Sequence, residues 1–155
     1  MAVRNYLGLL CAFAIWAFWI ETSCGLQLFH HDPVKAGKAA ETFVNKAVVE
    51  RKYAKAAENS VFDESSIEAF VSRVHKDGER PLGVSANAYE PLQGTERIKV
   101  YVDGVSIFYN NFYYLVILTL NDKGDYVVSD VLRIESKERF AESTSRRSFA
   151  ATLVR

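Results

Sequence analysis

The feature that most constrains the fold is a change of hydrophobic period near residue 78. Before it, over residues 33–78, apolar side chains recur every three or four residues, which is the spacing of one helical face. After it, over residues 82–134, they alternate with a period of two, as in strands with one buried face. Helices followed by strands predict an α+β domain, with N-terminal helices packed on a curved antiparallel sheet.

Capping residues define the helical half more closely. Asp32 is a good N-cap and Pro33 suits the first helical position, so the first helix is expected to begin there. This helix is expected to kink or break around residues 51–53. Ser65 opens a capping-box pattern for a further helix, and Gly78 fits the left-handed residue that ends one.

Turn residues divide the second half into about four strands. Residues 82–90, bounded by two prolines, predict an edge strand. Asp103-Gly104 predicts a two-residue hairpin turn, because both residue types tolerate positive φ. The run 112–120 is apolar on both faces and predicts a central strand, followed by a tight turn at 121–124. In the last strand Asp130 interrupts an apolar face, which is expected to consist of Tyr126, Val128, Leu132 and Ile134.

Composition excludes several functional classes. The 155 residues carry 19 Lys+Arg and 19 Asp+Glu, so no basic excess indicates a nucleic-acid partner. Two cysteines cannot form a disulfide-rich scaffold. His75 has no suitably spaced ligand partner, and the adjacent His30 and His31 lie in a polar joint, so we expect no metal site. No phosphate-binding glycine loop or nucleophile motif occurs, and we expect no cofactor and no catalytic residue.

The N-terminus has the pattern of an export signal. A single charge, Arg4, precedes an apolar run over residues 6–20 and then small residues. Cleavage after Gly25 is one interpretation, and the other is a lipoprotein signal in which Cys24 is acylated and becomes the N-terminus. An uncleaved anchor helix also stays open, although the run is shorter than the roughly 20 residues that span a bilayer.

These signals divide the chain into four parts. We expect residues 1–25 to be a signal peptide or lipoprotein signal, 26–33 a linker, and 34–136 the α+β domain. Residues 137–155 are a polar tail expected to be mostly disordered, with a short exposed helix as the alternative. The protein is therefore expected to be exported to the cell envelope or periplasm, held at a membrane by a lipid anchor or uncleaved signal, or otherwise secreted.

A resemblance to a known family adds to this interpretation. The segment AAETFVNKAVVERKYAKAAENSV, residues 80–83 at the entry to the sheet, and the hairpin DKGDYVVSDVLRIES are similar to the nuclear-transport-factor-two-like superfamily. That superfamily includes the ketosteroid-isomerase-like and SnoaL-like proteins and small exported bacterial families of unknown function. Over residues 34–136 the resemblance implies a cone-like fold. A cystatin-like fold is the structural alternative, but the inhibitory Gln-x-Val-x-Gly motif is absent.

The resemblance also bears on function. Its isomerase-like branch uses an Asp base with Tyr and Asp oxyanion donors, and here Tyr101, Tyr114 and Asp130 are the candidate ligand-binding residues. None of them lies in a family motif. We therefore expect an exported, non-enzymatic binding or accessory domain for a small apolar ligand or a partner protein, with a homodimer through the sheet face. The alternatives are an isomerase-like or SnoaL-like enzyme using an Asp/Tyr pair, and a structural subunit of an envelope assembly.

Overall fold

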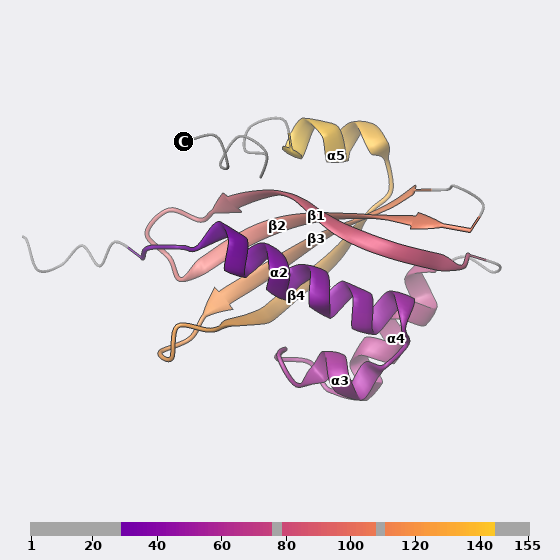
Figure 1. The fold of residues 1–155 in the computed structure, drawn as a ribbon, viewed down its shortest axis with the longest axis horizontal. Coiled ribbons are helices and arrows are strands. Elements are labelled where there is room, and N and C mark those ends of the chain that lie inside the picture. Colours follow the sequence, from indigo (N-terminus) through magenta and orange to yellow (C-terminus); the bar gives the residue numbers. More distant parts are fainter. Residues whose placement is uncertain (1–28, 76–78, 108–110, 145–155) are drawn as a thin grey trace, which may run out of the picture.

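A computed structural model gives the fold and describes residues 29–75, 79–107 and 111–144. Helices come first and strands second, as the change of hydrophobic period predicts (Figure 1). The result is a mixed α+β fold in which helices are followed by a four-stranded antiparallel open sheet. The α+β prediction is therefore confirmed.

The first helical region is amphipathic and turns sharply at Arg51. Its segments are helix α2 (Pro33–Val44), the π-helical stretch η1 (Asn45–Val49) and helix α3 (Tyr53–Ala57). Asp32 caps α2 as predicted, because its carboxylate accepts hydrogen bonds from the N–H groups of Val34 and Lys35. Arg51 has a φ of 53°, in the left-handed region. The predicted break at residues 51–53 is thus confirmed.

Helix α4 spans Glu64–Val74 and begins two residues earlier than the capping pattern suggests. Asp63 is the N-cap, and its Oδ1 accepts from the Ser66 N–H at 2.7 Å. The Ser65 hydroxyl donates to the same carboxylate at 3.0 Å instead of capping the helix. The prediction of Ser65 as the cap is therefore wrong, because a carboxylate two residues upstream takes that role.

The other end of α4 is set by His75. Its N–H still donates to the carbonyl of Val71 at 3.0 Å, but its backbone is extended, with φ −85° and ψ 133°. The chain therefore leaves the helix at Val74. Gly78, predicted to end this helix, lies outside the described residues.

The four strands pair in chain order, each antiparallel to the next. They are β1 (Pro81–Pro91), β2 (Arg97–Ser106), β3 (Asn111–Leu120) and β4 (Tyr126–Ile134). Strand β1 lies at an edge and β3 between two neighbours, as predicted for residues 82–90 and 112–120. Gly124, with a φ of 77°, closes the predicted turn at 121–124.

The predicted hairpin at Asp103-Gly104 is wrong. Both residues lie inside β2, where Asp103 pairs with Tyr113 and Gly104 with Phe112. Glycine is needed at 104 for space: a Cβ there would lie 2.2 Å from ring atoms of Phe112. An aromatic ring from the neighbouring strand therefore fills the position that sequence alone marks as a turn.

A β-bulge in β4 changes which side chains face the helices. The register shifts where Ile117 pairs with Asp130 and Leu118 with Val128. Beyond the bulge, Val131 packs against the main core and Arg133 is cross-strand to Tyr114 on the same face. The predicted apolar row is therefore interrupted: Leu132 is 50% exposed, and Ile134 packs on the other face of the sheet.

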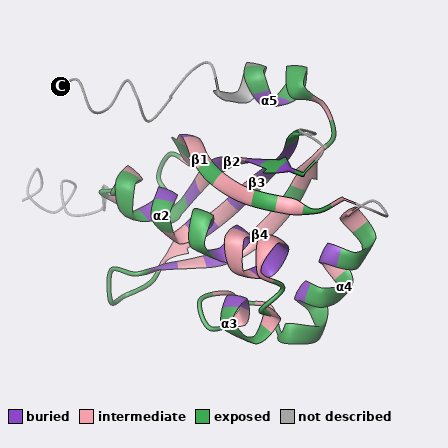
Figure 2. Ribbon diagram, turned by 45° about the vertical axis from the view of Figure 1, so that its right-hand side comes forward, coloured by how far each residue is buried: buried purple, intermediate pink, exposed green. Residues whose placement is uncertain are grey.

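The main core lies between the sheet and the helices α2, η1, α3 and α4. Figure 2 shows the buried residues on the sides of the helices and strands that face each other. Strands contribute Ile98, Val100, Val102, Phe112, Tyr114, Val116 and Leu118, and helices contribute Ala36, Ala40, Phe43, Val44, Ile67 and Val71. We call this side of the sheet its first face.

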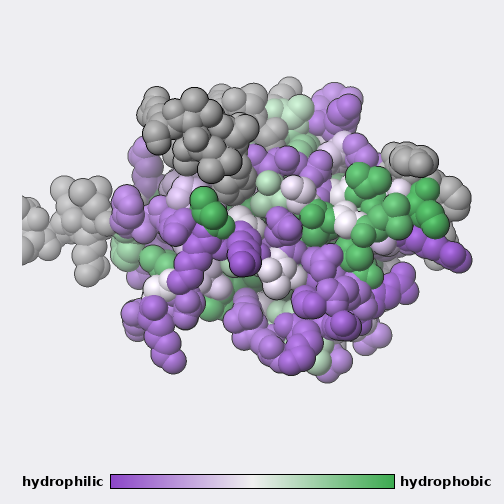
Figure 3. All heavy atoms as spheres, viewed as in Figure 1, coloured by the Kyte–Doolittle hydropathy of each residue, from purple (hydrophilic) through white to green (hydrophobic). Residues whose placement is uncertain are grey.

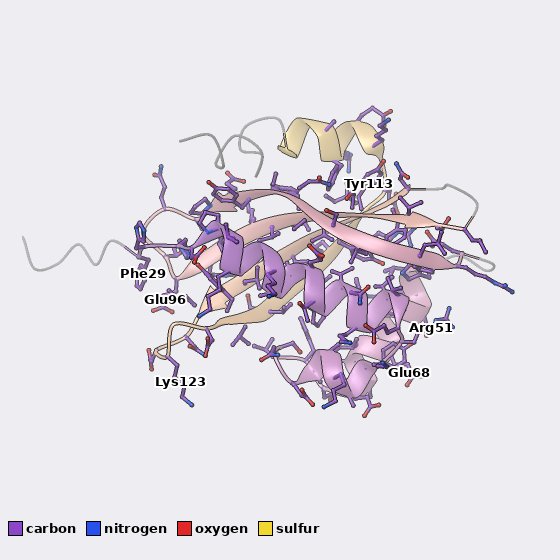
Figure 4. The ribbon with its side chains drawn as sticks, viewed as in Figure 1. Phe29, Arg51, Glu68, Glu96, Tyr113 and Lys123 are labelled. Atoms are coloured by element: carbon purple, nitrogen blue, oxygen red, sulfur yellow. The ribbon has the colours of Figure 1, made fainter. Side chains whose placement is uncertain are left out.

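The second face of the sheet is partly covered by helix α5 (Lys137–Thr144). Phe140 is buried there against Tyr101 and Tyr113, and its ring centroid lies 4.6 Å from that of Tyr113. Figure 4 shows Tyr113 on the side of the sheet where α5 lies. Of the two alternatives for the tail, residues 137–144 form the short helix and not the preferred disordered segment, because Phe140 anchors this polar helix on the sheet. Residues 145–155 lie outside the described part of the chain.

Among the residues with described structure, none of the helices has both the length and the apolar character needed to cross a bilayer.

Candidate functional site

Two adjoining hollows separate helix α4 from strand β4. One has a volume of about 340 Å³ and the other about 690 Å³. Both are lined by Phe70 and Arg73 of α4 and by Val131 of β4, so they lie side by side, and we call the pair the α4–β4 cleft. Phe43 and Phe62 also line the smaller hollow. The larger hollow is lined in addition by Val74 and His75, at the end of α4.

The walls of the cleft follow from the periodicity of α4. Ile67 and Val71 are buried in the core, whereas Phe70 is only partly buried and Arg73 is exposed at the mouth. On the opposite wall Asp130 lies at the β-bulge and lines the smaller hollow. The cleft thus combines phenylalanine rings with a few charged side chains, which is the usual character of a small-molecule site. Those side chains are Arg73 and Arg133, which are basic, and Asp130 and Glu135, which are acidic.

Four polar side chains form a buried network beside the larger hollow. Arg133 donates to both carboxylate oxygens of Glu79, at 3.0 and 2.9 Å. His75 Nδ1 lies 2.9 Å from Glu79 Oε2, and His75 Nε2 lies 2.7 Å from the Tyr114 hydroxyl. Arg133 also donates to the Val74 carbonyl. We call Glu79, His75, Tyr114 and Arg133 the buried network.

Most of the buried network is closed to solvent. The side chains of His75 and Glu79 are 8% and 10% exposed, that of Arg133 is 16% exposed, and Tyr114 is completely buried. A bidentate pair between guanidinium and carboxylate is the geometry that best compensates the loss of hydration. The network joins the end of α4, the residues before β1, and strands β3 and β4.

Burial also determines the protonation of the network. It lowers the pKa of His75, an effect that Arg133 reinforces and the Glu79 carboxylate opposes. Burial raises the pKa of Tyr114 well above its usual value. A neutral imidazole fits this geometry, with Nδ1–H donating to Glu79 and Nε2 accepting from the Tyr114 hydroxyl. Burial would lower the pKa of Arg133, but hydrogen bonding to Glu79 raises it overall.

Sequence reasoning missed the buried network because its members are far apart in the chain. The Tyr114 hydroxyl contacts His75, which lies 39 positions away in the chain. Arg133 contacts Glu79, which lies 54 positions away. Only the bulge in β4 turns Arg133 toward the first face. A local signal was the closeness in sequence of His75 and Glu79, which flank the end of an amphipathic helix and the start of the sheet.

The structure does not bring the three candidate residues into one site. Tyr101 lies on the second face, where it packs against Phe140 and its hydroxyl is 3.4 Å from Glu90 Oε2. Tyr114 lies on the first face, with its hydroxyl bound to His75. Asp130 lines the cleft, and its Oδ1 accepts from the N–H of Val131 at 2.8 Å. Within the described ranges, no tyrosine hydrogen-bonds Asp130.

Two other sequence hypotheses concern processing and metal binding. Cys24, the predicted lipidation residue, lies outside the described residues. Over residues 29–75, 79–107 and 111–144, no group of three or more His, Cys, Asp and Glu side chains gathers as a metal site requires.

Comparison with protein-family models, curated proteins and solved structures found no match to this chain. The geometry of the cleft and of the buried network is therefore the basis for a functional proposal.

Proposed function

We propose that this protein is a non-enzymatic binding domain that holds a small ligand with an apolar body in the α4–β4 cleft. The observation that carries the proposal is the pair of adjacent hollows that share Phe70, Arg73 and Val131 in their walls. Phenylalanine rings would cover the apolar body of the ligand. Arg73 forms no ion pair within the described part of the chain, so its guanidinium is free to contact an anionic or polar end.

The polar groups around the cleft favour binding over catalysis. Both ring nitrogens of His75 have partners within the protein, so the imidazole has no free lone pair for a proton from a ligand. Tyr114 is completely buried and lines neither hollow. Asp130 is in the cleft without a tyrosine partner in the described structure. An isomerase-like Asp/Tyr pair therefore has less support than a binding site.

Export and family membership belong to the same proposal. The apolar run at residues 6–20 supports export, with either acylated Cys24 or cleavage after Gly25 producing the mature N-terminus. Helices packed on one face of an antiparallel sheet support a nuclear-transport-factor-two-like fold, with a cystatin-like fold as the alternative. A homodimer through the second face would form beside α5, because Phe140 already covers Tyr101 and Tyr113.

The proposed cleft can be tested with 8-anilinonaphthalene-1-sulfonate, a probe that combines apolar rings with an anionic group. We expect the full chain, kept in a non-ionic detergent, to bind this probe saturably. In an NMR titration the shifted backbone amides should lie in α4 and in Val131–Arg133 of β4. Native mass spectrometry of the purified chain would then identify any small molecule that co-purifies.

A matched pair of variants makes the test specific. Arg73→Gln removes the free cation from the cleft, and we expect it to weaken probe binding about tenfold. Arg97→Gln makes the same change on β2, at an exposed residue that lines neither hollow, and should leave binding unchanged. Equal effects of both variants, or shifts confined to other elements, would reject the cleft as the binding site.

A further inference from the structure

A third hollow shares Phe43 with the smaller hollow of the α4–β4 cleft and has a largely basic lining. It has a volume of about 240 Å³ and lies between α2, α3 and the start of β4. Four lysines line it against a single carboxylate, that of Asp125. The lysines are Lys35, Lys38, Lys46 and Lys55. We call this recess the lysine hollow, and Figure 3 shows hydrophilic side chains gathered over α2 and α3.

Helical spacing brings these groups together. Along α2 and η1, polar side chains recur at intervals close to whole helical turns, so they share one side of the helix. These side chains are Lys35, Lys38, Thr42 and Lys46. Lys55 of α3 comes from the other side, because the chain reverses at Arg51. The floor of the hollow is apolar and is formed by Ala39, Phe43 and Ala56.

Some hydrogen-bond donors in the lysine hollow are unused. In the described structure the Lys38 ammonium, the Thr42 hydroxyl and the Asn59 side-chain amide have no hydrogen-bond partner, and all three residues line the hollow. Lys38 is also the one of the four lysines without an ion pair among the residues described. These groups offer three different kinds of donor around one small recess.

The other lysines have carboxylate partners but remain partly or largely exposed. Lys35 pairs with Asp125, Lys46 with Glu50 and Lys55 with Glu58, and their side chains are 50%, 33% and 64% exposed. Exposed ion pairs of this kind contribute little in water. A bound dianion can therefore contact these ammonium groups at small cost. With their three carboxylate partners counted, the unpaired Lys38 leaves a net positive charge that would attract it.

We propose that the lysine hollow binds a phosphate group. A phosphate carries up to two negative charges and several acceptor oxygens, which suit converging ammonium, hydroxyl and amide donors. The phosphate could belong to a small soluble compound or to the headgroup of an anionic phospholipid, because both present the same chemistry. Apart from Phe43 the site shares no lining residue with the α4–β4 cleft, and it does not depend on the function proposed for that cleft.

The direct test is a titration of the full chain in non-ionic detergent with pyrophosphate, followed by NMR. We expect saturable shifts of the backbone amides at Lys38, Thr42 and Asn59. Lys38→Gln should weaken binding about tenfold. The control Lys99→Gln removes the same charge from β2, where Lys99 pairs with Glu90 and does not line the hollow, and it should leave the affinity unchanged.

A second titration distinguishes the two sources of phosphate. The chain and both variants are mixed with vesicles of phosphatidylcholine alone, or of phosphatidylcholine with phosphatidylglycerol. Binding of pyrophosphate that depends on Lys38 supports a soluble phosphate compound, and binding to the anionic vesicles alone that depends on Lys38 supports a lipid headgroup. If Lys38→Gln and Lys99→Gln have equal effects with both probes, or if neither probe binds, the proposal is overturned.

Discussion

The buried network and the lysine hollow are both built from charged side chains, but they differ in how completely those charges are partnered. In the network, the Glu79 carboxylate and both nitrogens of His75 are used inside the protein. In the hollow, Lys38, Thr42 and Asn59 keep free donors. A charge withdrawn from water must be paired, whereas an exposed one need not be. The network is therefore expected to stabilise the fold, and the hollow to be available to a ligand.

The largest effect is expected from breaking the ion pair of the buried network. Arg133→Leu leaves the Glu79 carboxylate, 10% exposed, without its bidentate partner. We expect the free energy of unfolding to fall by about 3–5 kcal/mol, measured by urea denaturation. His75 should in turn become easier to protonate, because Arg133 no longer opposes its positive charge.

A double variant separates the lost pairing from lost packing. Replacing both partners, with Glu79→Leu and Arg133→Leu together, removes the buried carboxylate along with the guanidinium that neutralises it and should restore part of the stability. If the double variant is less stable than Arg133→Leu by the full cost of a second substitution, the pair is not coupled. The contrast with the lysine hollow would then lose its physical basis.

The next effect concerns the ring that supports His75. Phe112 packs edge-on against the imidazole, with ring centroids 5.7 Å apart, and occupies the space above Gly104. Gly104→Ala should force this ring to move and lower stability by about 1–3 kcal/mol, again measured by urea denaturation. Adding Phe112→Leu should recover part of the loss. A Gly104→Ala variant as stable as the parent would show that the ring moves freely.

The two regions also differ in how far sequence could predict them. The change of hydrophobic period identified the order of elements, and Asp32 and Gly124 marked a cap and a turn correctly. These are local signals, set by residues a few positions apart. The basic face of the first helix could also be read locally, since Lys35 and Lys38 lie on one turn. Only their convergence with Lys55 required the three-dimensional structure.

The buried network could not be predicted in the same way. It depends on the bulge that turns Arg133 inward and on the pairing of Arg133 with Tyr114 across two strands. Asp103-Gly104 failed as a turn for a similar reason, because packing of Phe112 on the neighbouring strand overrides the local preference. Likewise a polar tail became a helix through one residue, Phe140. Such long-range contacts leave little trace in the spacing of residues.

A smaller effect is expected from pH, and it acts on the network. The pKa of His75 is lower in the folded protein than its ordinary value of 6.5, chiefly through burial. Below about pH 6.5 the unfolded chain therefore binds more protons than the folded protein. The stability that depends on neutral His75 is lost as the pH falls through the pKa of His75 in the folded protein. We expect lower stability at about pH 5.5 than at about pH 7.5, measured by urea denaturation.

His75→Gln serves as the control for this pH dependence. Glutamine does not titrate, so the difference in stability between the two pH values should shrink in the variant. Two carboxylates, those of Glu50 and Asp63, also have lowered pKa values, because of hydrogen bonds from lysines and from Ser66 respectively. Their contributions are lost only as the pH falls below their ordinary values of 4.5 and 3.8, outside this window. An unchanged difference in His75→Gln would assign the pH dependence to another group.

The smallest effect on stability is expected at the lysine hollow, and it completes the contrast. Lys35 pairs with Asp125 at 3.0 Å, but the two side chains are 50% and 62% exposed. Lys35→Gln should change the free energy of unfolding by less than about 1 kcal/mol, because water already solvates both charges. The same variant should weaken pyrophosphate binding, whereas Arg133→Leu, tested under conditions where it stays folded, should not. If Lys35→Gln destabilised the protein as much as Arg133→Leu, the lysines of the hollow would stabilise the fold. Ligand binding would then not explain the free donors beside them.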